Sequence, residues 1–274
     1  MKKRLLCPSL PKPGCPTSLN ENEAHHATHV LRLRDGDIIE AMDGQGNHRL
    51  ATLRVLRGKP CLEYLESTPP SASTRPQMPH LPIILEMGII KGEAMEWIVE
   101  KAVELGVQRL IPVVTNHTVV QMKKKGPKAF QERWQKIADQ ALKQCGRLHR
   151  LEVDLPIPLE DVLSQRPPTS KMTRLWCDET STGESPYLLN WLLTHPLPPS
   201  GTIHLLIGPE GGWSSQEKSL LTQEVSISHP GLQVECYRID LGPQILRAET
   251  AAVFGASLLT SFGLNSHYGP KFSQ

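Results

Sequence analysis

A proline- and serine-rich stretch at residues 67–79 divides the chain into two parts with different patterns. The stretch has no apolar periodicity, and its prolines favour an extended backbone, so neither a helix nor a paired strand is expected in it. The 274-residue chain is long enough to build a hydrophobic core on each side. We therefore expect a domain at 1–70, a linker at 71–80 and a second domain at 81–274.

The part before the linker has the pattern of a small antiparallel β domain. Its apolar segments at 38–42, 50–56 and 61–65 are short, and they are separated by turns rich in aspartate and glycine at 35–37 and 43–46. Residues of these two types favour tight turns between neighbouring strands. We expect a barrel-like β fold there.

After the linker, strand patterns alternate with helical patterns, which favours an α/β domain with a largely parallel sheet and helices on its faces. The first expected helix spans 91–106, where apolar side chains recur at helical spacing and Gly106 is placed to end the helix. The other expected elements are strands at 81–87, 110–114, 174–177, 203–207 and 234–241, and helices at 127–146 and 245–262.

The net charge of +2 hides an uneven distribution along the chain. Basic residues exceed acidic ones by three in 1–80 and by five in 81–150, whereas acidic residues are in excess by six in 151–274. A basic surface built from the first half would suit a polyanionic partner. Ordinary solvated charge explains the same count equally well.

Cysteine and histidine spacing indicates neither disulfides nor a metal site. The six cysteines are scattered, with no Cys-x-x-Cys pair and no cluster at zinc spacing, so we expect reduced thiols in the cytoplasm. His25, His26 and His29 lack neighbouring ligands and are expected on a helix surface. The basic N-terminus is not followed by the apolar core of a signal peptide, and no apolar run reaches the ~18 residues of a membrane span.

Two glycine-containing junctions between a strand and a helix are the most informative features. In the first, residues 208–212 read Gly-Pro-Glu-Gly-Gly, and Ser214 with Glu217 forms a capping box. The second begins at 241–243 with Leu-Gly-Pro. Such junctions at the carboxyl ends of parallel strands leave main-chain groups free to bind an adenine or a ribose, and glycine allows a close approach.

Neither junction is a dinucleotide fingerprint or a P-loop, so pyrophosphate binding is not supported. Each junction taken alone could equally be a structural turn. The two together favour a ligand site, because Arg247 and Glu249 stand at the start of the helix that follows the second one.

Several motifs, in order along the chain, resemble the RsmE family of ribosomal RNA methyltransferases. The front domain contributes His25-His26 followed by Val-Leu-Arg at 30–32. The remaining motifs are Lys-Gly-Glu-Ala-Met-Glu-Trp-Ile-Val-Glu-Lys-Ala-Val-Glu-Leu-Gly-Val at 91–107, Gln-Cys-Gly-Arg at 144–147, Leu-Ile-Gly-Pro-Glu-Gly-Gly at 206–212 and Leu-Gly-Pro-Gln-Ile-Leu-Arg-Ala-Glu-Thr-Ala at 241–251. The resemblance covers nearly the whole chain, from about Arg4 to about Phe262.

This resemblance implies a methyltransferase of the SPOUT superfamily that uses S-adenosylmethionine to methylate N3 of a uridine in small-subunit (16S) ribosomal RNA. It implies a C-terminal parallel-sheet domain with a trefoil knot, although chains in general avoid knots. It also implies a PUA-like RNA-binding β domain at the front and a homodimer. A SPOUT ribose 2′-O-methyltransferase and a non-catalytic RNA-binding ribosome-assembly factor remain alternatives.

The resemblance also assigns candidate site residues. Arg247 would be catalytic or would orient the uracil, Glu249 would accept a proton or brace Arg247, and Arg147 would contact substrate or cap a helix. The expected cofactor-binding residues are Leu206, Ile207, Gly208, Pro209, Glu210, Gly211, Leu241, Gly242, Ile245 and Leu246. The expected phosphate-contacting residues are Arg4, Arg32, Arg34, Lys59, Lys91 and Lys123.

The sequence departs from the family pattern at two places. Lys143 stands where a glutamate is common in the family, so the polar network around Arg147 is expected to differ from the family pattern. Leu5 and Leu6 stand where an aromatic residue is common in the family, so the stacking contact that the family pattern implies near Arg4 lacks its ring. Trp213 follows the first glycine junction and is expected to pack in the core.

Overall fold

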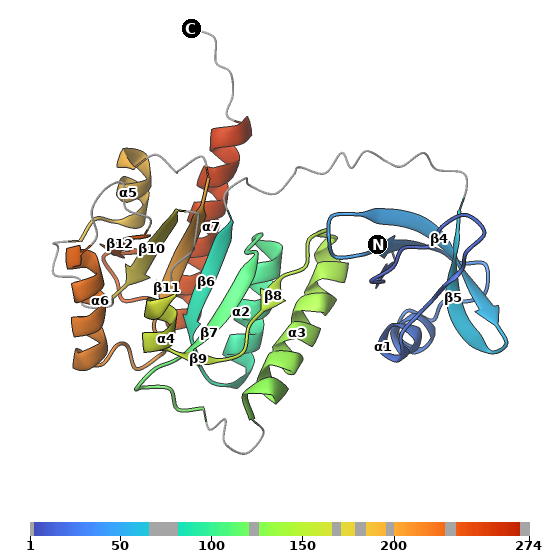
Figure 1. The fold of residues 1–274 in the computed structure, drawn as a ribbon, viewed down its shortest axis with the longest axis horizontal. Coiled ribbons are helices and arrows are strands. Elements are labelled where there is room, and N and C mark those ends of the chain that lie inside the picture. Colours follow the sequence, from blue (N-terminus) through green and yellow to red (C-terminus); the bar gives the residue numbers. More distant parts are fainter. Residues whose placement is uncertain are drawn as a thin grey trace, which may run out of the picture. The chain divides into compact units, whose positions relative to one another are not determined.

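The computed structural model describes residues 3–65, 82–120, 126–165, 171–178, 185–195, 200–227 and 234–268. The chain forms two compact units (Figure 1): Met1–Gln77 with Asp139–Arg150, and Met78–Ala138 with Leu151–Gln274. The expected linker at 71–80 lies outside the described residues. The grouping of 139–150 with the first unit was not expected from the sequence, which placed the whole of 81–274 in one domain.

The first unit is a curled five-stranded sheet in the order β1-β3-β4-β5-β2, with a short helical segment against it. β1 and β3 are parallel, and the other pairs are antiparallel as expected. Leu5, Ile39, Leu53 and Leu62 are fully buried in its core. Its elements are β1 (Arg4–Leu6), β2 (Thr17–Ser18), α1 (Glu21–His25), the π-helical η1 (His26–Val30), β3 (Ile38–Met42), β4 (His48–Leu56) and β5 (Lys59–Tyr64).

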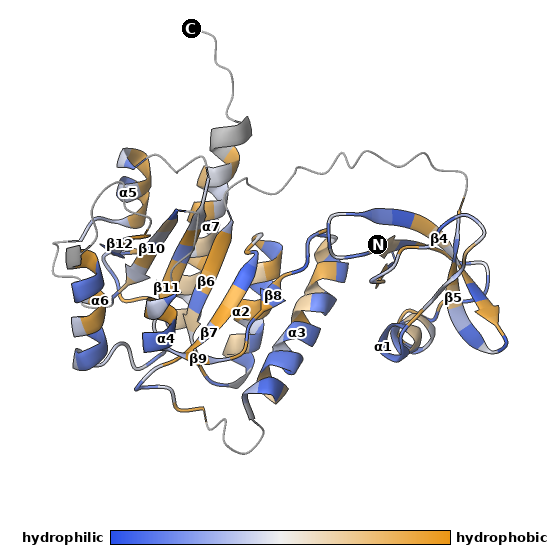
Figure 2. Cartoon of the chain, viewed as in Figure 1, coloured by the Kyte–Doolittle hydropathy of each residue, from blue (hydrophilic) through white to orange (hydrophobic). Residues whose placement is uncertain are grey.

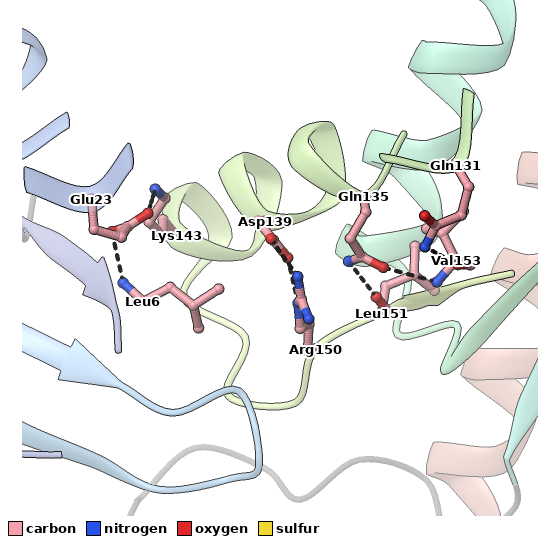
Figure 3. A network of polar contacts seen from close by, with 9 residues as sticks. All are labelled: Leu6, Glu23, Gln131, Gln135, Asp139, Lys143, Arg150, Leu151 and Val153. Atoms are coloured by element: carbon pink, nitrogen blue, oxygen red, sulfur yellow. Dashed lines mark hydrogen bonds and ion pairs between the residues drawn. The ribbon is translucent and has the colours of Figure 1, made fainter. Parts of the chain in front are cut away.

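Lys143 belongs to a buried polar network in this unit, shown in Figure 3. Its ammonium lies 2.6 Å from Oε1 of Glu23, and Oε2 of Glu23 accepts a hydrogen bond from the Leu6 amide at 3.0 Å. Both charged side chains are about nine-tenths buried, so each charge has its partner within the unit. The lysine that departs from the family pattern is therefore balanced by a glutamate 120 residues away.

Arg4 is also tied down within the first unit. Its guanidinium donates to Oε2 of Glu40 and to the backbone carbonyls of Lys143 and Gln144. These carbonyls belong to the last turn of α3 (Gly126–Cys145), where a cation is favourable for the helix dipole. Arg4 is thus held by three acceptors within the unit, and an RNA-binding role for it stays a prediction.

The second unit contains a seven-stranded sheet, and the α/β prediction is confirmed. All of its strand pairs are parallel, and the order is β12-β10-β11-β6-β7-β8, with β9 also pairing with β7. Its strands are β6 (Ile83–Gly88), β7 (Arg109–Val114), β8 (Glu152–Val153), β9 (Ile157–Pro158), β10 (Met172–Cys177), β11 (Thr202–Ile207) and β12 (Val234–Ile239). α3 begins in this unit and ends in the first one. The other helices of the second unit are α2 (Gly92–Glu104), α4 (Leu159–Ser164), α5 (Leu188–Thr194), α6 (Ser215–Ile227) and α7 (Ala248–Tyr268).

Helices cover both faces of this sheet (Figures 1 and 2). α4 and α6 pack on one face around Trp176 and Leu206. α2 and α7 pack on the other, where Gly255 of α7 lies so close to β11 that an added Cβ would come within 2.7 Å of Leu205. β6, β10 and β11 are buried along nearly their whole length, and much of β6 and β7 is hydrophobic in Figure 2, as expected for a parallel sheet covered on both faces.

Most expected element boundaries agree with the structure to within a few residues. The expected C-cap at Gly106 is confirmed: this residue has φ +84°, and Val107 and Gly106 donate to the carbonyls of Ala102 and Val103. The expected helix start at Ile245 is wrong, because α7 begins at Ala248. β12 likewise ends at Ile239 rather than 241, so a loop of several residues, not a tight turn, joins β12 to α7.

A buried charged triad crosses three adjacent strands of the sheet. Arg174 on β10 donates two hydrogen bonds to the Glu86 carboxylate on β6, at 2.9 and 3.1 Å. His204 on β11, between them, lies 2.6 Å from Oε1 of Glu86. Burial opposes the ionisation of Glu86, but the interactions of its carboxylate with Arg174 and His204 outweigh burial and lower the pKa of Glu86 to about 2.

No helix among the described residues is long and apolar enough to cross a membrane. The same residues contain no group of three or more His, Cys, Asp or Glu side chains that could hold a metal ion. His25 and His29 instead stack on each other at the exposed surface of α1 and η1, with ring centroids 4.4 Å apart. The trefoil knot stays a prediction.

Candidate functional site: a cavity at the carboxyl ends of three strands

A cavity of about 690 Å³ lies in the second unit, where β10, β11 and β12 end. This volume is within the range of roughly 300–1,000 Å³ that is usual for small-molecule sites. Ligands of open parallel sheets bind outside the carboxyl ends of the strands, so the position agrees with the expectation from the two glycine junctions. Two loops form most of its wall: 208–214 after β11 and 240–247 after β12.

In the first wall loop, Gly208 is needed for space and Gly212 for its backbone conformation. An added Cβ at Gly208 would lie 3.1 Å from the ring of Trp213, and Gly212 has φ +64°. Trp213 is buried, and its Nε1 donates to the carbonyl of Cys177 at 2.8 Å. The expected packing role of Trp213 is therefore observed, and its indole lines the cavity as well.

The second wall loop leads into α7. Ala251 donates to the carbonyl of Arg247, which makes Arg247 the N-cap residue of this helix. A cation is unfavourable beside the positive end of a helix dipole, whereas Glu249 in the first turn is favourable. Arg247 is exposed and lines the cavity together with Glu249. Helix stability therefore does not explain the arginine at this position.

Among the charged residues that line the cavity, acidic ones outnumber basic ones. Its ionisable side chains include four carboxylates and one arginine: Asp178, Glu210, Asp240, Glu249 and Arg247. The Asp178 carboxylate is already paired with Lys218 at 2.9 Å and with Arg238 at 3.0 Å. The remaining acidic excess favours a ligand with positive charge.

The structure brings together most of the residues expected to bind the cofactor. Ile207, Gly208, Pro209, Glu210, Gly211, Leu241, Gly242, Ile245 and Leu246 all line the cavity. Leu206 does not; it is fully buried among core residues on the side of α4 and α6. Arg147 belongs to the first unit and is not among the lining residues. Burial lowers the pKa of Arg147 to about 10.

Sequence reasoning missed Cys177, Asp178 and Asp240. The register pairs Cys177 with Ile239, so the two aspartates follow the ends of neighbouring strands side by side. A strand followed by an acidic residue was visible in the sequence, but the neighbours of that strand in the sheet were not. Burial and the two carboxylates raise the pKa of Cys177, so this thiol is not a reactive nucleophile.

The expected phosphate-contacting residues differ in their surroundings. Arg32, Arg34 and Lys59 are exposed in the first unit, and Arg32 has an unusual backbone with φ +50°. Lys91 is exposed at the start of α2 in the second unit, where its amide donates to Oε1 of Glu210. Lys123 lies outside the described residues.

Comparison with known proteins agrees with this architecture. The family model described as an RNA methyltransferase domain matches residues 77–260, and that of an RNA methyltransferase PUA domain matches 19–62. The ribosomal RNA small subunit methyltransferase E of Bacillus subtilis is 27% identical, over 89% of both chains. That of Synechocystis is 30% identical over 85% of this chain and 69% of its own length.

A solved structure extends the comparison to three dimensions. The ribosomal RNA small subunit methyltransferase E of Neisseria gonorrhoeae, bound to S-adenosylmethionine, matches with a TM-score of 0.76 and 28% identity. The match covers 95% of this chain and 98% of that one. The fold and the position of the cavity define a SPOUT-type RNA methyltransferase with an N-terminal PUA domain. Within that class, the chain belongs to the RsmE family of ribosomal RNA small subunit methyltransferases.

Proposed function

We propose that this protein transfers a methyl group from S-adenosylmethionine to N3 of a uridine in 16S ribosomal RNA. The observation that carries the proposal is the cavity at the carboxyl ends of β10, β11 and β12, with Arg247 and Glu249 at the start of α7 in its wall. Family membership supports the RNA substrate, since the relatives are named as small-subunit ribosomal RNA methyltransferases.

The residues present fit S-adenosylmethionine. The two wall loops offer main-chain groups for its adenosine part, and Gly242 leaves room because an added Cβ there would meet no protein atom within 4 Å. The acidic lining suits the positive sulfonium. When bound, this group provides an electrophilic methyl carbon beside the acceptor. The protein then has to position uracil in line and exclude other acceptors.

Arg247 would stabilise the anion that uracil becomes when N3 loses its weakly acidic proton. The N–H groups in the first turn of α7 add to this, because the helix start is an anion-binding position. Such preorganised positive charge is effective because it needs no rearrangement during the reaction. Glu249, two residues on, would either accept the N3 proton or brace the guanidinium. We favour bracing, in which case the N3 proton passes to solvent water.

We further propose that the first unit binds the sugar-phosphate backbone of the RNA. The β4–β5 hairpin turns through Arg57 and Gly58, and both have positive φ. A left-handed conformation costs a residue other than glycine about 1–2 kcal/mol, so an arginine at this tip is not explained by folding. Together with Arg32, Arg34 and Lys59, Arg57 would bind phosphates of the RNA backbone, and such contacts do not depend on the base sequence.

Calorimetric titration with S-adenosylmethionine tests the cofactor assignment. The purified protein is expected to bind one equivalent per chain. Because the acidic lining recognises the sulfonium, S-adenosylhomocysteine, which lacks this charge, is expected to bind more weakly in the same titration. No detectable heat and no change in melting temperature with S-adenosylmethionine would exclude the methyltransferase hypothesis.

A matched pair of glycine variants tests whether this cavity is the cofactor site. Gly242→Ala is expected to fold with unchanged stability, since its backbone is ordinary and no protein atom opposes the Cβ, but to bind S-adenosylmethionine at least tenfold more weakly. Gly14→Ala is the control: it lies in the first unit with φ +70°, and should lose a little stability while keeping its affinity. Equal affinity of the Gly242 variant and the wild type would place the cofactor elsewhere.

We propose that the protein is a homodimer in the cytoplasm. α5 and α7 pack together, and large apolar side chains remain exposed on them and beside them: Tyr187, Leu189, Leu193, Ile245 and Phe254. Exposed apolar side chains that gather on neighbouring elements favour association. Because Ile245 lines the cavity, a second copy there would also help to enclose the cofactor.

Light scattering after size exclusion is expected to give twice the 30.5 kDa mass of the chain. Leu193→Asp adds a charge to a side chain that is 68% exposed, so it should shift the protein toward monomer without unfolding it. Val55→Asp, at an exposed apolar position in the first unit, should leave the mass unchanged. A wild-type monomer, or a Leu193 variant that stays fully dimeric, would contradict this interface.

A further inference from the structure

The first wall loop of the cavity is held from outside by the turn that follows β7. Nδ1 of His117 lies 2.8 Å from the carbonyl oxygen of Gly211 and 3.0 Å from that of Gly212. A carbonyl oxygen only accepts hydrogen bonds, so Nδ1 must carry a hydrogen and donate it to both. One imidazole therefore fixes two consecutive peptide groups, and the first belongs to a residue that lines the cavity.

The residue before His117 holds the other end of the same loop. The Asn116 amide donates to Oε1 of Glu217 at 2.8 Å, while Oε2 of Glu217 accepts from the Ser214 amide at 2.8 Å. The Asn116 side chain also donates to the Ser214 hydroxyl. The capping-box glutamate of α6 thus joins the two loops with both of its oxygens, and it is buried. The turn after β7 therefore contacts both the glycines of the 208–214 loop and Ser214 at the end of that loop.

His117 also packs closely against Gly211. An added Cβ at Gly211 would lie 3.0 Å from Cβ of His117 and 3.4 Å from its Cγ. The conformation at Gly211 and Gly212 is therefore matched to this side chain both in hydrogen bonding and in shape. His117 itself is not among the residues that line the cavity.

We propose that His117 is a positioning residue, which holds the 208–214 loop in the conformation that binds S-adenosylmethionine. The proposal rests on the proposed function, because the ligand of the cavity is the methyl donor. Without the imidazole donor, two carbonyls lose their partner and the glycine-rich segment gains conformational freedom that binding must then remove. The effect belongs to cofactor affinity and not to methyl transfer.

Two variants separate this role from a general structural one. His117→Phe keeps a ring but removes the donor, whereas His117→Asn keeps an N–H close to the position of Nδ1. We expect His117→Phe to bind S-adenosylmethionine about tenfold more weakly and to raise its KM similarly, with kcat at saturating cofactor within about threefold of wild type. His117→Asn should recover most of the affinity. Without cofactor, amide hydrogen exchange in 210–214 should be faster in the Phe variant.

The outcomes distinguish failure of the proposed function from failure of the positioning role of His117. If wild type fails to bind S-adenosylmethionine, the proposed function is wrong. If wild type binds and His117→Phe binds equally well, with unchanged exchange in 210–214, only the positioning role is wrong. A Phe variant that loses kcat and melting temperature together, without recovery in the Asn variant, would also overturn it, because that is the result of general misfolding.

Discussion

Arg247→Ala is expected to lower kcat about 100- to 1,000-fold while the affinity for S-adenosylmethionine changes less than about threefold. The size follows from removing one preorganised positive group from a developing anion. Cofactor affinity should persist because the two wall loops bind mainly through their main chain. Single-turnover methylation of 16S ribosomal RNA at saturating cofactor, with calorimetry of cofactor binding, measures both quantities.

The stability of this variant provides an internal control. Arg247 occupies the N-cap position of α7, where its positive charge is unfavourable for the helix dipole. Its removal should therefore leave the free energy of unfolding unchanged or raise it by about 0.3–1 kcal/mol. Activity and stability are then expected to move in different directions. Arg247→Lys keeps a positive charge and should retain intermediate activity. Full turnover in Arg247→Ala would remove this residue from the chemistry.

Glu86→Ala is expected to lower the free energy of unfolding by about 3–5 kcal/mol, because it leaves the fully buried Arg174 without its carboxylate. Chemical denaturation of the purified variant measures this loss. Replacing the whole triad by apolar residues of similar volume, as in Glu86→Leu with Arg174→Met and His204→Leu, should recover most of it. A loss below about 1 kcal/mol for Glu86→Ala would mean that the buried charges are not paired as described.

The same residue predicts a dependence on pH. The pKa of Glu86 is lowered in the folded protein from its ordinary 4.5 to about 2. Its contribution to stability is therefore complete above about pH 4.5 and is lost as the pH falls toward 2. The stability difference between wild type and Glu86→Gln should shrink over this acidic interval. A difference that stays constant from pH 6 to pH 2.5 would contradict the lowered pKa.

Local sequence patterns predicted the parts of the site that depend on local geometry. Gly208 and Gly212 could be recognised because a turn between strand and helix needs them, and the Ser214–Glu217 capping box is present as expected. The start of α7 was placed too early because Ile245 and Leu246 continue its apolar period. In the structure Ile245 is 77% exposed and lies in the loop before the helix.

Other parts of the site depend on contacts between distant segments, which periodicity does not reveal. Cys177 and Asp178 reach the cavity because β10 lies between β11 and β12, an order that no local pattern contains. The buried Lys143–Glu23 pair joins residues 120 positions apart. The role of His117 likewise depends on β7 and β11 ending at the same edge of the sheet.

The nucleosides of 16S ribosomal RNA test the central claim most directly. Mass spectrometry should compare a strain that lacks this gene with the same strain carrying either the wild-type gene or the Arg247→Ala variant. N3-methyluridine is expected to be absent from the deletion strain, to return with the wild-type gene and to remain absent with the variant. Persistence of N3-methyluridine in the deletion strain, together with loss of a ribose 2′-O-methylated nucleoside or of no nucleoside at all, would contradict the account.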